Sequence, residues 1–179
     1  MTSSQLLFDT LRQSVWYSIE LVWLFFPILA ANQMGHFPYW KMPVSVRYLG
    51  GNKTRGAYVA GPLYAMTAVS VLWVIEPQLS AHFGVLTLGD AFRVGALIGL
   101  GVVLGDQLNS CQKRLRGMPQ GTPSILDRFD WALGGGIFAT LALDNVEASH
   151  VLALVDIAAP AHVYFNRNSY LRGWRKTEH

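Results

Sequence analysis

Residues 57–75, AYVAGPLYAMTAVSVLWVI, form one apolar stretch without a single charged side chain. A helix on the surface of a soluble protein carries a polar face, and this stretch has no residues that could supply one. Roughly 20 mostly apolar residues are what an α-helix needs to cross a bilayer. The stretch therefore predicts a membrane-spanning helix and argues against a soluble helical protein.

Comparable stretches recur along the 179-residue chain, in which 51% of the residues are hydrophobic and only 14% are charged. We predict an all-α, polytopic membrane protein, a single integral-membrane domain over residues 1–179, with about five spans at 14–33, 57–75, 93–108, 131–147 and 149–166. The fourth departs most from a full span, because it is short and glycine-rich. The first is not a signal peptide on this interpretation, since Asp9 and Arg12 make a poor basic leader and more spans follow.

Basic and acidic connections alternate between these spans. The basic ones are the long loops 34–56 and 109–130 and the C-terminal tail, and the acidic ones are 76–92 and the short turn after the fourth span. Basic residues mark the cytoplasmic side of a multi-span protein. The pattern predicts an inner-membrane protein with its N-terminus outside, its C-terminus in the cytoplasm and both long loops cytoplasmic. It also explains the net charge of +3 without nucleic-acid binding.

The densest polar segment is 105–130, GDQLNSCQKRLRGMPQGTPSILDRFD. Asp106, Ser110 and Lys113 fall at i, i+4 and i+7, so a helix would place them on one face. Asp127 and Asp130 are three apart and would share a face at the start of the next helix. Taken singly, the acid after the loop could be a helix cap and the lysine could extend to the membrane interface. Their combined spacing favours a site.

Converging carboxylates beside Lys113 and Arg114 are what phosphoryl-type transfer requires. Hard oxygen ligands hold Mg²⁺, which bridges phosphate oxygens, and basic side chains neutralise the remaining phosphate charge.

A second segment, GGNKTRG at 50–56, surrounds Asn52, Lys53, Thr54 and Arg55 with glycines. It lacks the P-loop pattern, yet a glycine-rich basic loop can bind phosphate through backbone N–H groups. Taken alone, the segment is better explained as a basic turn.

Together the two segments resemble the phosphatidate cytidylyltransferases (CDP-diacylglycerol synthases), and more closely the short CDP-archaeol synthase branch. The family's S-x-x-K-R…D-R-x-D motif is similar to Ser110, Lys113 and Arg114 followed by Asp127-Arg128-Phe129-Asp130. The similarity also includes Gly105-Asp106, the 52–56 loop, and His162 and Asn166 near the end of the last span. The resemblance covers roughly residues 45–175. The Lys-Asp and His-Gly-Gly segments of the diacylglycerol branch are absent, as is an aspartate expected near Arg47. The absence of the Lys-Asp and His-Gly-Gly segments favours the archaeol-like branch and leaves the lipid open.

The resemblance implies an enzyme that converts CTP and a lipid phosphate, archaeol-phosphate-like or phosphatidate, into a CDP-lipid and pyrophosphate in phospholipid biosynthesis. It implies Mg²⁺ as the cofactor and a cytoplasmic active site. The implied metal ligands are Asp106, Asp127 and Asp130, the implied catalytic residues are Lys113, Arg114, Asp127 and Asp130, and the implied substrate-binding residues are Asn52, Lys53, Thr54, Arg55, Ser110, Arg128, His162 and Asn166.

Other functions remain open on the sequence alone. A small transporter or channel would use Asp106 and Asp156 as intramembrane acidic sites, but it predicts internal repeats, and none is evident. A non-catalytic membrane partner would leave the Asp/Lys/Arg spacing unexplained. The motif of the CDP-alcohol phosphotransferases is absent. The role of Asp156 and the oligomeric state, including a homodimer, are not determined by the sequence.

Overall fold

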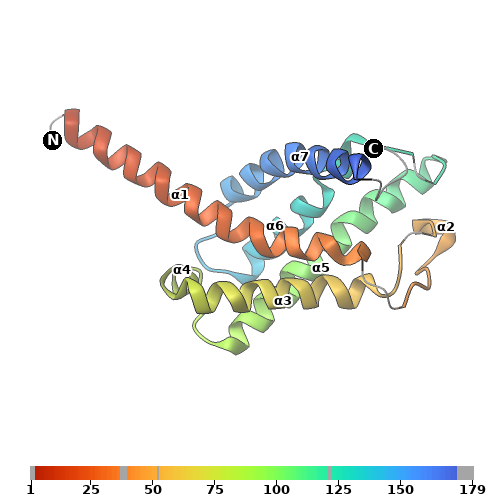
Figure 1. Cartoon of the computed structure of the whole chain (residues 1–179), viewed down its shortest axis with the longest axis horizontal. Coiled ribbons are helices and arrows are strands. Elements are labelled where there is room, and N and C mark those ends of the chain that lie inside the picture. The colour runs from red at the N-terminus through yellow and green to blue at the C-terminus, as the bar shows by residue number, and fades with distance from the viewer. Residues whose placement is uncertain (1–2, 37–39, 52, 121, 173–179) are drawn as a thin grey trace.

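The computed structural model describes residues 3–36, 40–51, 53–120 and 122–172, and within them the chain is helical (Figure 1). The elements, in order, are α1 (Ser3–Asn32), the 3-10 helix η1 (Gln33–His36), α2 (Val46–Leu49), α3 (Ala57–Ile75), α4 (Pro77–His82), α5 (Leu88–Leu115), the 3-10 helix η2 (Ile125–Arg128), α6 (Asp130–Ala142) and α7 (Ala148–Leu171). Over these residues no strand forms, and the one β-bridge joins Pro43 to Thr54. The all-α prediction is confirmed.

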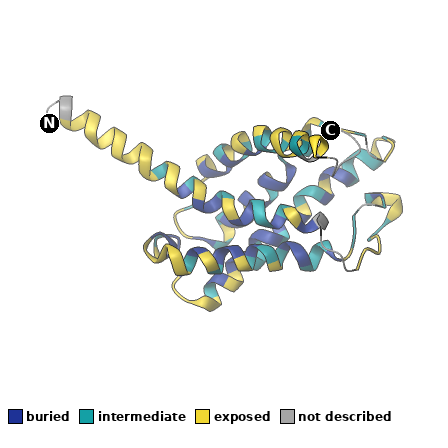
Figure 2. Cartoon of the chain, viewed as in Figure 1, coloured by how far each residue is buried: buried dark blue, intermediate teal, exposed yellow. Residues whose placement is uncertain are grey.

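Four helices in the described ranges are long and apolar enough to cross a membrane: α1, α3, α5 and α7. Their outward faces carry many exposed apolar side chains, as expected of surfaces that contact lipid (Figure 2). The chain is therefore an integral membrane protein. The helices also extend past several predicted limits, because α1 begins at Ser3 and α5 runs from Leu88 to Leu115.

The predicted fourth span, 131–147, is wrong in its extent. The helix there is α6, whose 13 residues end at Ala142. At 1.5 Å per residue it is about 20 Å long, against a hydrocarbon core of about 30 Å. The chain nevertheless returns to the far end of the bundle, because Asn145 Nδ2 donates to the carbonyl of His82 at 2.7 Å and the N–H of Asp144 donates to Phe83 at 3.2 Å.

Helix α5 lies at the centre of the bundle, packed against α3 on one side and α6 on the other. Glycines permit both contacts. A Cβ on Gly99 would lie 2.5 Å from Cα of Pro62, and one on Gly101 would lie 2.5 Å from the carbonyl oxygen of Gly134. Small residues allow membrane helices to approach this closely. These α5 glycines therefore serve helix packing.

The end of the bundle that carries α4 holds a buried cluster of Glu20, His82 and His150, which we call the far-end cluster. Glu20 is 7% exposed, and its carboxylate oxygens lie 3.0 Å from His82 Nε2 and 3.3 Å from His150 Nε2. Because His150 Nδ1 accepts the N–H of Glu147 at 3.1 Å, the ring proton of a neutral His150 is on Nε2 and points to Glu20. The cluster ties α1, α4 and α7 together. The N-terminal half of α1 projects beyond it (Figure 1).

Candidate functional site

The candidate site lies at the opposite end of the bundle, where loop 40–56 folds against α5. Lys53 Nζ lies 2.5 Å and 2.6 Å from the two carboxylate oxygens of Asp106. The backbone of this loop is fixed by short-range pairing, since the N–H of Val44 donates to Lys53 at 2.8 Å and the N–H of Arg55 donates to Met42 at 2.9 Å. The loop predicted to bind phosphate is therefore held beside the predicted acid of the third span.

A second ion pair joins the end of α5 to η2. Lys113 Nζ lies 2.6 Å from Asp127 Oδ1, and Asp127 Oδ2 accepts the N–H of Ser124 at 2.7 Å. Ser124 and Asp127 form a capping box, so the aspartate both caps the start of η2 and binds the lysine. Burial acts to raise the pKa of Asp127, but the hydrogen bond from Lys113, the Ser124 N–H and the lysine charge outweigh it and hold this pKa below its ordinary value.

Asn109 links the carboxylates of the two neighbouring elements. Its Nδ2 donates to Asp127 Oδ1 at 2.7 Å and to Asp130 Oδ2 at 2.5 Å. The side chain is 5% exposed, and within the described residues its Oδ1 is buried without a hydrogen-bond partner. Sequence reasoning missed this residue. Its position, three after Asp106 and four before Lys113 on the same helix, was the available signal.

Asp130 is the most buried of the predicted acids, at 8% exposure. Burial and the nearby charge of Asp106 raise its pKa to about 6, against hydrogen bonds from Asn109 and the Trp131 N–H, and with a further contribution from Asp127. Its backbone also contacts α5 closely, because a Cβ on Gly105 would overlap the carbonyl oxygen of Asp130. Gly105 therefore sets how near this acid comes to α5.

The metal prediction is only partly matched by this geometry. In the part of the chain that the structure describes, no group of three or more His, Cys, Asp or Glu side chains has the spacing of a metal site. Asp106 pairs with Lys53, and Asp127 pairs with Lys113. Two features nevertheless fit a hard cation: the Asn109 oxygen, which has no partner among the described residues, and Asp130, a buried acid with two further carboxylates nearby and no cationic partner among the described residues. The metal site remains a prediction.

The structure locates most of the other predicted residues without joining them to this cluster. Arg114 follows the paired lysine on α5, and its Nε is buried without a hydrogen-bond partner among the described residues. Ser110 is buried, Thr54 is half-buried, and Arg55 and Arg128 are exposed. On α7, Asn166 Nδ2 lies 2.6 Å from His162 Nε2. Asn52 lies outside the described residues.

The arrangement suits binding of a polyphosphate. Two lysines and three carboxylates meet at one end of an apolar helical bundle. Cationic donors at such a site bind phosphate oxygens, and the acids can hold a cation that the phosphates share.

The chain resembles known proteins in sequence and in fold, although no protein-family model matches it. The CDP-archaeol synthase of Pyrococcus horikoshii is 29% identical over 131 residues, 73% of this chain and 74% of the relative. That of Pyrococcus furiosus is 27% identical over 130 residues, 72% and 74% of the two chains. That of Thermococcus onnurineus is 25% identical over 170 residues, 87% of this chain and 95% of the relative.

A solved structure of an intramembrane enzyme for archaeal membrane lipid biosynthesis has the same fold, with a TM-score of 0.65 and 21% identity, and the match covers 81% of this chain and 91% of that one. The resemblance predicted from the motif residues is thus confirmed: the chain is a homologue of the curated CDP-archaeol synthases.

Proposed function

We propose that this chain is a CTP-dependent cytidylyltransferase that converts CTP and a membrane lipid phosphate into a CDP-lipid and pyrophosphate. The observation that carries the proposal is the contact of Asn109 with both Asp127 and Asp130, beside the two lysine–aspartate pairs. Apart from Asn109, these residues belong to the segments that resemble the family, and the sequence similarity to CDP-archaeol synthases supports the proposal.

The reaction is a displacement at phosphorus. An oxygen of the lipid phosphate attacks the α-phosphorus of CTP, a P–O bond forms there, and the bond from the α-phosphorus to the oxygen that bridges to the β-phosphorus breaks. The leaving group is pyrophosphate. No protein nucleophile is needed, since positioning and charge stabilisation can carry such a transfer. Lys53, Lys113 and Arg114 are the groups that bind the triphosphate and the departing pyrophosphate.

The residues that would hold Mg²⁺ are Asp106, Asp127 and Asp130, with Asn109 Oδ1 as a further oxygen donor. Among the described residues Asp106 and Asp127 each pair with a lysine, whereas Asp130 has no cationic partner, so its carboxylate is available to a divalent cation. When bound, Mg²⁺ supplies a Lewis acid that withdraws charge from the reacting phosphates. If Asp106 and Asp127 held the metal, their partners Lys53 and Lys113 would be available to phosphate oxygens.

The charge pattern supports a site on the cytoplasmic side of the inner membrane, where CTP is found. Loop 40–56 and the residues after α5 lie together at the site's end of the bundle, and both are basic segments. Basic residues next to spans mark the cytoplasmic face. A soluble nucleotide and a lipid head group can meet only at such an interface.

The transporter or channel alternative is disfavoured by the position of Asp156. Its side chain is exposed on α7, so the only acid in the middle of that helix does not line an internal path. The similarity to CDP-archaeol synthases favours transfer over transport as well.

The test uses purified protein in detergent with labelled CTP, Mg²⁺, and either an ether-linked archaeol phosphate or phosphatidate. Asp127→Asn and Asp130→Asn should each abolish CDP-lipid formation while the protein keeps its thermal unfolding transition. Asp9→Asn, an exposed acid on α1, is the matched control and should leave the rate unchanged. A folded Asp127→Asn protein with wild-type activity would refute the proposal. Removing Mg²⁺ with a chelator should stop the reaction, and returning it should restore the rate.

A further inference from the structure

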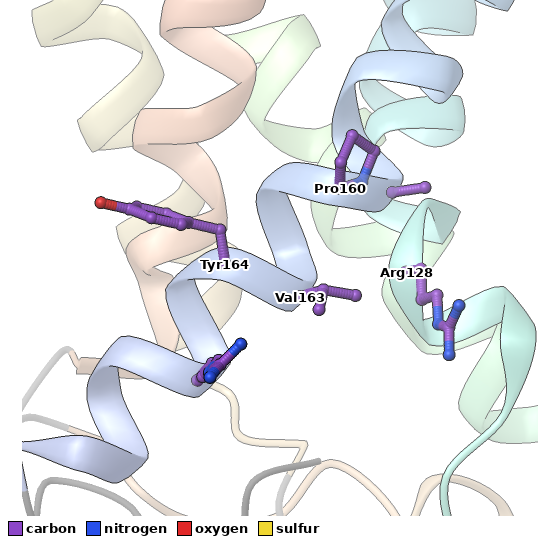
Figure 3. Close-up of a pocket in the computed structure, with 6 residues that line it drawn as sticks. Arg128, Pro160, Val163 and Tyr164 are labelled. Atoms are coloured by element: carbon purple, nitrogen blue, oxygen red, sulfur yellow. The ribbon is translucent and has the colours of Figure 1, made fainter.

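A groove of about 400 Å³ lies beside the candidate site, between η2 and the C-terminal half of α7 (Figure 3). It is lined by Arg128, Ala159, Pro160, Val163, Tyr164 and Arg167. Pro160 and Val163 project from α7 toward the segment that carries Arg128 (Figure 3). The size falls within the range of small-molecule sites, roughly 300–1,000 Å³.

The groove is cationic, and its charges have no partner among the residues that the structure describes. Neither the side chain of Arg128 nor that of Arg167 makes a hydrogen bond or an ion pair with any described residue. Asp127, the acid next to Arg128 in the chain, is already engaged by Lys113, Asn109 and the N–H of Ser124. Two guanidinium groups thus remain for an external anion.

The position of Arg167 strengthens this argument. It falls inside the last candidate span, Ala148–Asn168, where a charge is costly unless it reaches water or a partner. A lone arginine in a span can extend its side chain to the membrane–water interface, where its charge is hydrated. It does not explain why Arg167 shares an apolar groove with a second arginine that comes from another element.

The remaining wall is apolar and faces outward. Ala159, Pro160 and Val163 line it, and Val163 is 48% exposed. Pro160 has no N–H, so its ring presents only hydrocarbon to the groove. A ligand seated here would place a dianionic group against the arginines and an apolar part against α7, in contact with the surrounding bilayer.

We propose that this groove binds the lipid substrate as a phosphomonoester, with Arg167 and Arg128 as its phosphate ligands. The proposal rests on the proposed function and deepens it, because it assigns the acceptor lipid its own entrance beside the nucleotide site. Arg128 immediately follows Asp127, so a phosphate bound in the groove lies next to the acids that serve the transfer. An arginine fork suits a phosphate group, which accepts two parallel hydrogen bonds.

The kinetic test compares Arg167→Gln with Arg116→Gln, a matched change of an exposed arginine just after α5. Losing one charge-assisted contact should raise the KM for the lipid phosphate by roughly tenfold. The KM for CTP should stay as in the wild type, and Arg116→Gln should alter neither value. Val163→Trp fills the groove without changing its charge and should also raise the KM for the lipid. If Arg167→Gln behaves like Arg116→Gln, the proposal is wrong.

A binding test separates this inference from the proposed function. Native mass spectrometry without CTP should show dioleoyl phosphatidate retained by the wild type and by Arg116→Gln, but lost from Arg167→Gln. Dioleoyl phosphatidylcholine, which has no phosphomonoester, should not be retained. Competition by inorganic phosphate at the same concentration would mark a site for soluble phosphate and overturn the proposal.

The two failures are distinguishable. Retention that depends on Arg167, in a protein that makes no CDP-lipid, would uphold the groove and refute the transferase. If the wild type forms CDP-lipid and Arg167→Gln has an unchanged KM for the lipid, the transferase is upheld and the groove is refuted as the lipid site.

Discussion

Gly105→Ala is a sharp test of how the site is assembled. The added Cβ would overlap the carbonyl oxygen of Asp130 and lie 3.1 Å from Cα of Gly134. Both obstacles are backbone atoms, so no side-chain rotation relieves them, and the start of α6 must move. Overpacking of this kind costs about 1–3 kcal/mol, and the better helix propensity of alanine returns about 0.5–1 kcal/mol. We expect a net loss of about 1–2 kcal/mol.

The control for this change is Gly89→Ala near the start of the same helix. A Cβ there meets only Thr87 Oγ1 at 3.5 Å, an ordinary contact, so stability should stay level or rise. Thermal unfolding in detergent measures both. The Asp130 carboxylate moves with its backbone, and a displacement of about 1 Å can cost roughly 10²-fold in rate. If Gly105→Ala unfolds like Gly89→Ala and keeps its activity, the glycine does not set the approach of α6.

Three further predictions concern other parts of the molecule. Glu20→Gln removes the charge that holds the far-end cluster together and should lower the unfolding free energy by about 1–3 kcal/mol, whereas the exposed Glu76→Gln should be neutral in the same denaturation assay. The pKa of Asp127 lies below its ordinary value despite burial, so this acid contributes stability that is present above the ordinary pKa and lost as the pH falls through the lowered one. Lys113→Met should therefore shift acid unfolding, followed by circular dichroism, to a higher pH, and an unchanged midpoint would contradict this. A reporter fused to the C-terminus should be active only in the cytoplasm, and a periplasmic signal would reverse the proposed topology.

The long helices and much of the site could be predicted from local sequence. Apolar length identifies α3, α5 and α7, and helical spacing places Asp106 and Lys113 on one face of α5. The capping box between Ser124 and Asp127 is a pattern of four consecutive residues that predicts the position of Asp127 at the start of η2. These features depend on neighbours in the chain, which is why a single sequence reveals them.

Long-range contacts were harder to predict. Lys53 and Asp106 are 53 residues apart, and nothing local indicates that this lysine, rather than Arg55, reaches the acid. Asn109 was missed because an amide within a helix has no charge signature, although it contacts both acids. The early end of α6 was available in the sequence, because polar residues follow directly after Leu143, at Asp144, Asn145 and Glu147, and the predicted span ran through them. The contact of Asn145 with His82, 63 residues earlier, is what the sequence does not reveal.

The brevity of α6 has a consequence for how substrates reach the acids. Asp130 begins α6, and Asp106 lies nine residues before the end of α5, about 14 Å along its axis. Asp130 packs against α5 at Gly105, so both carboxylates lie below the tip of α5 rather than at it. Asp130 is largely shielded from water, so its charge acts more strongly on a phosphate than it would at the open surface. A lipid can bring its head group to this level while its tails remain in their own leaflet.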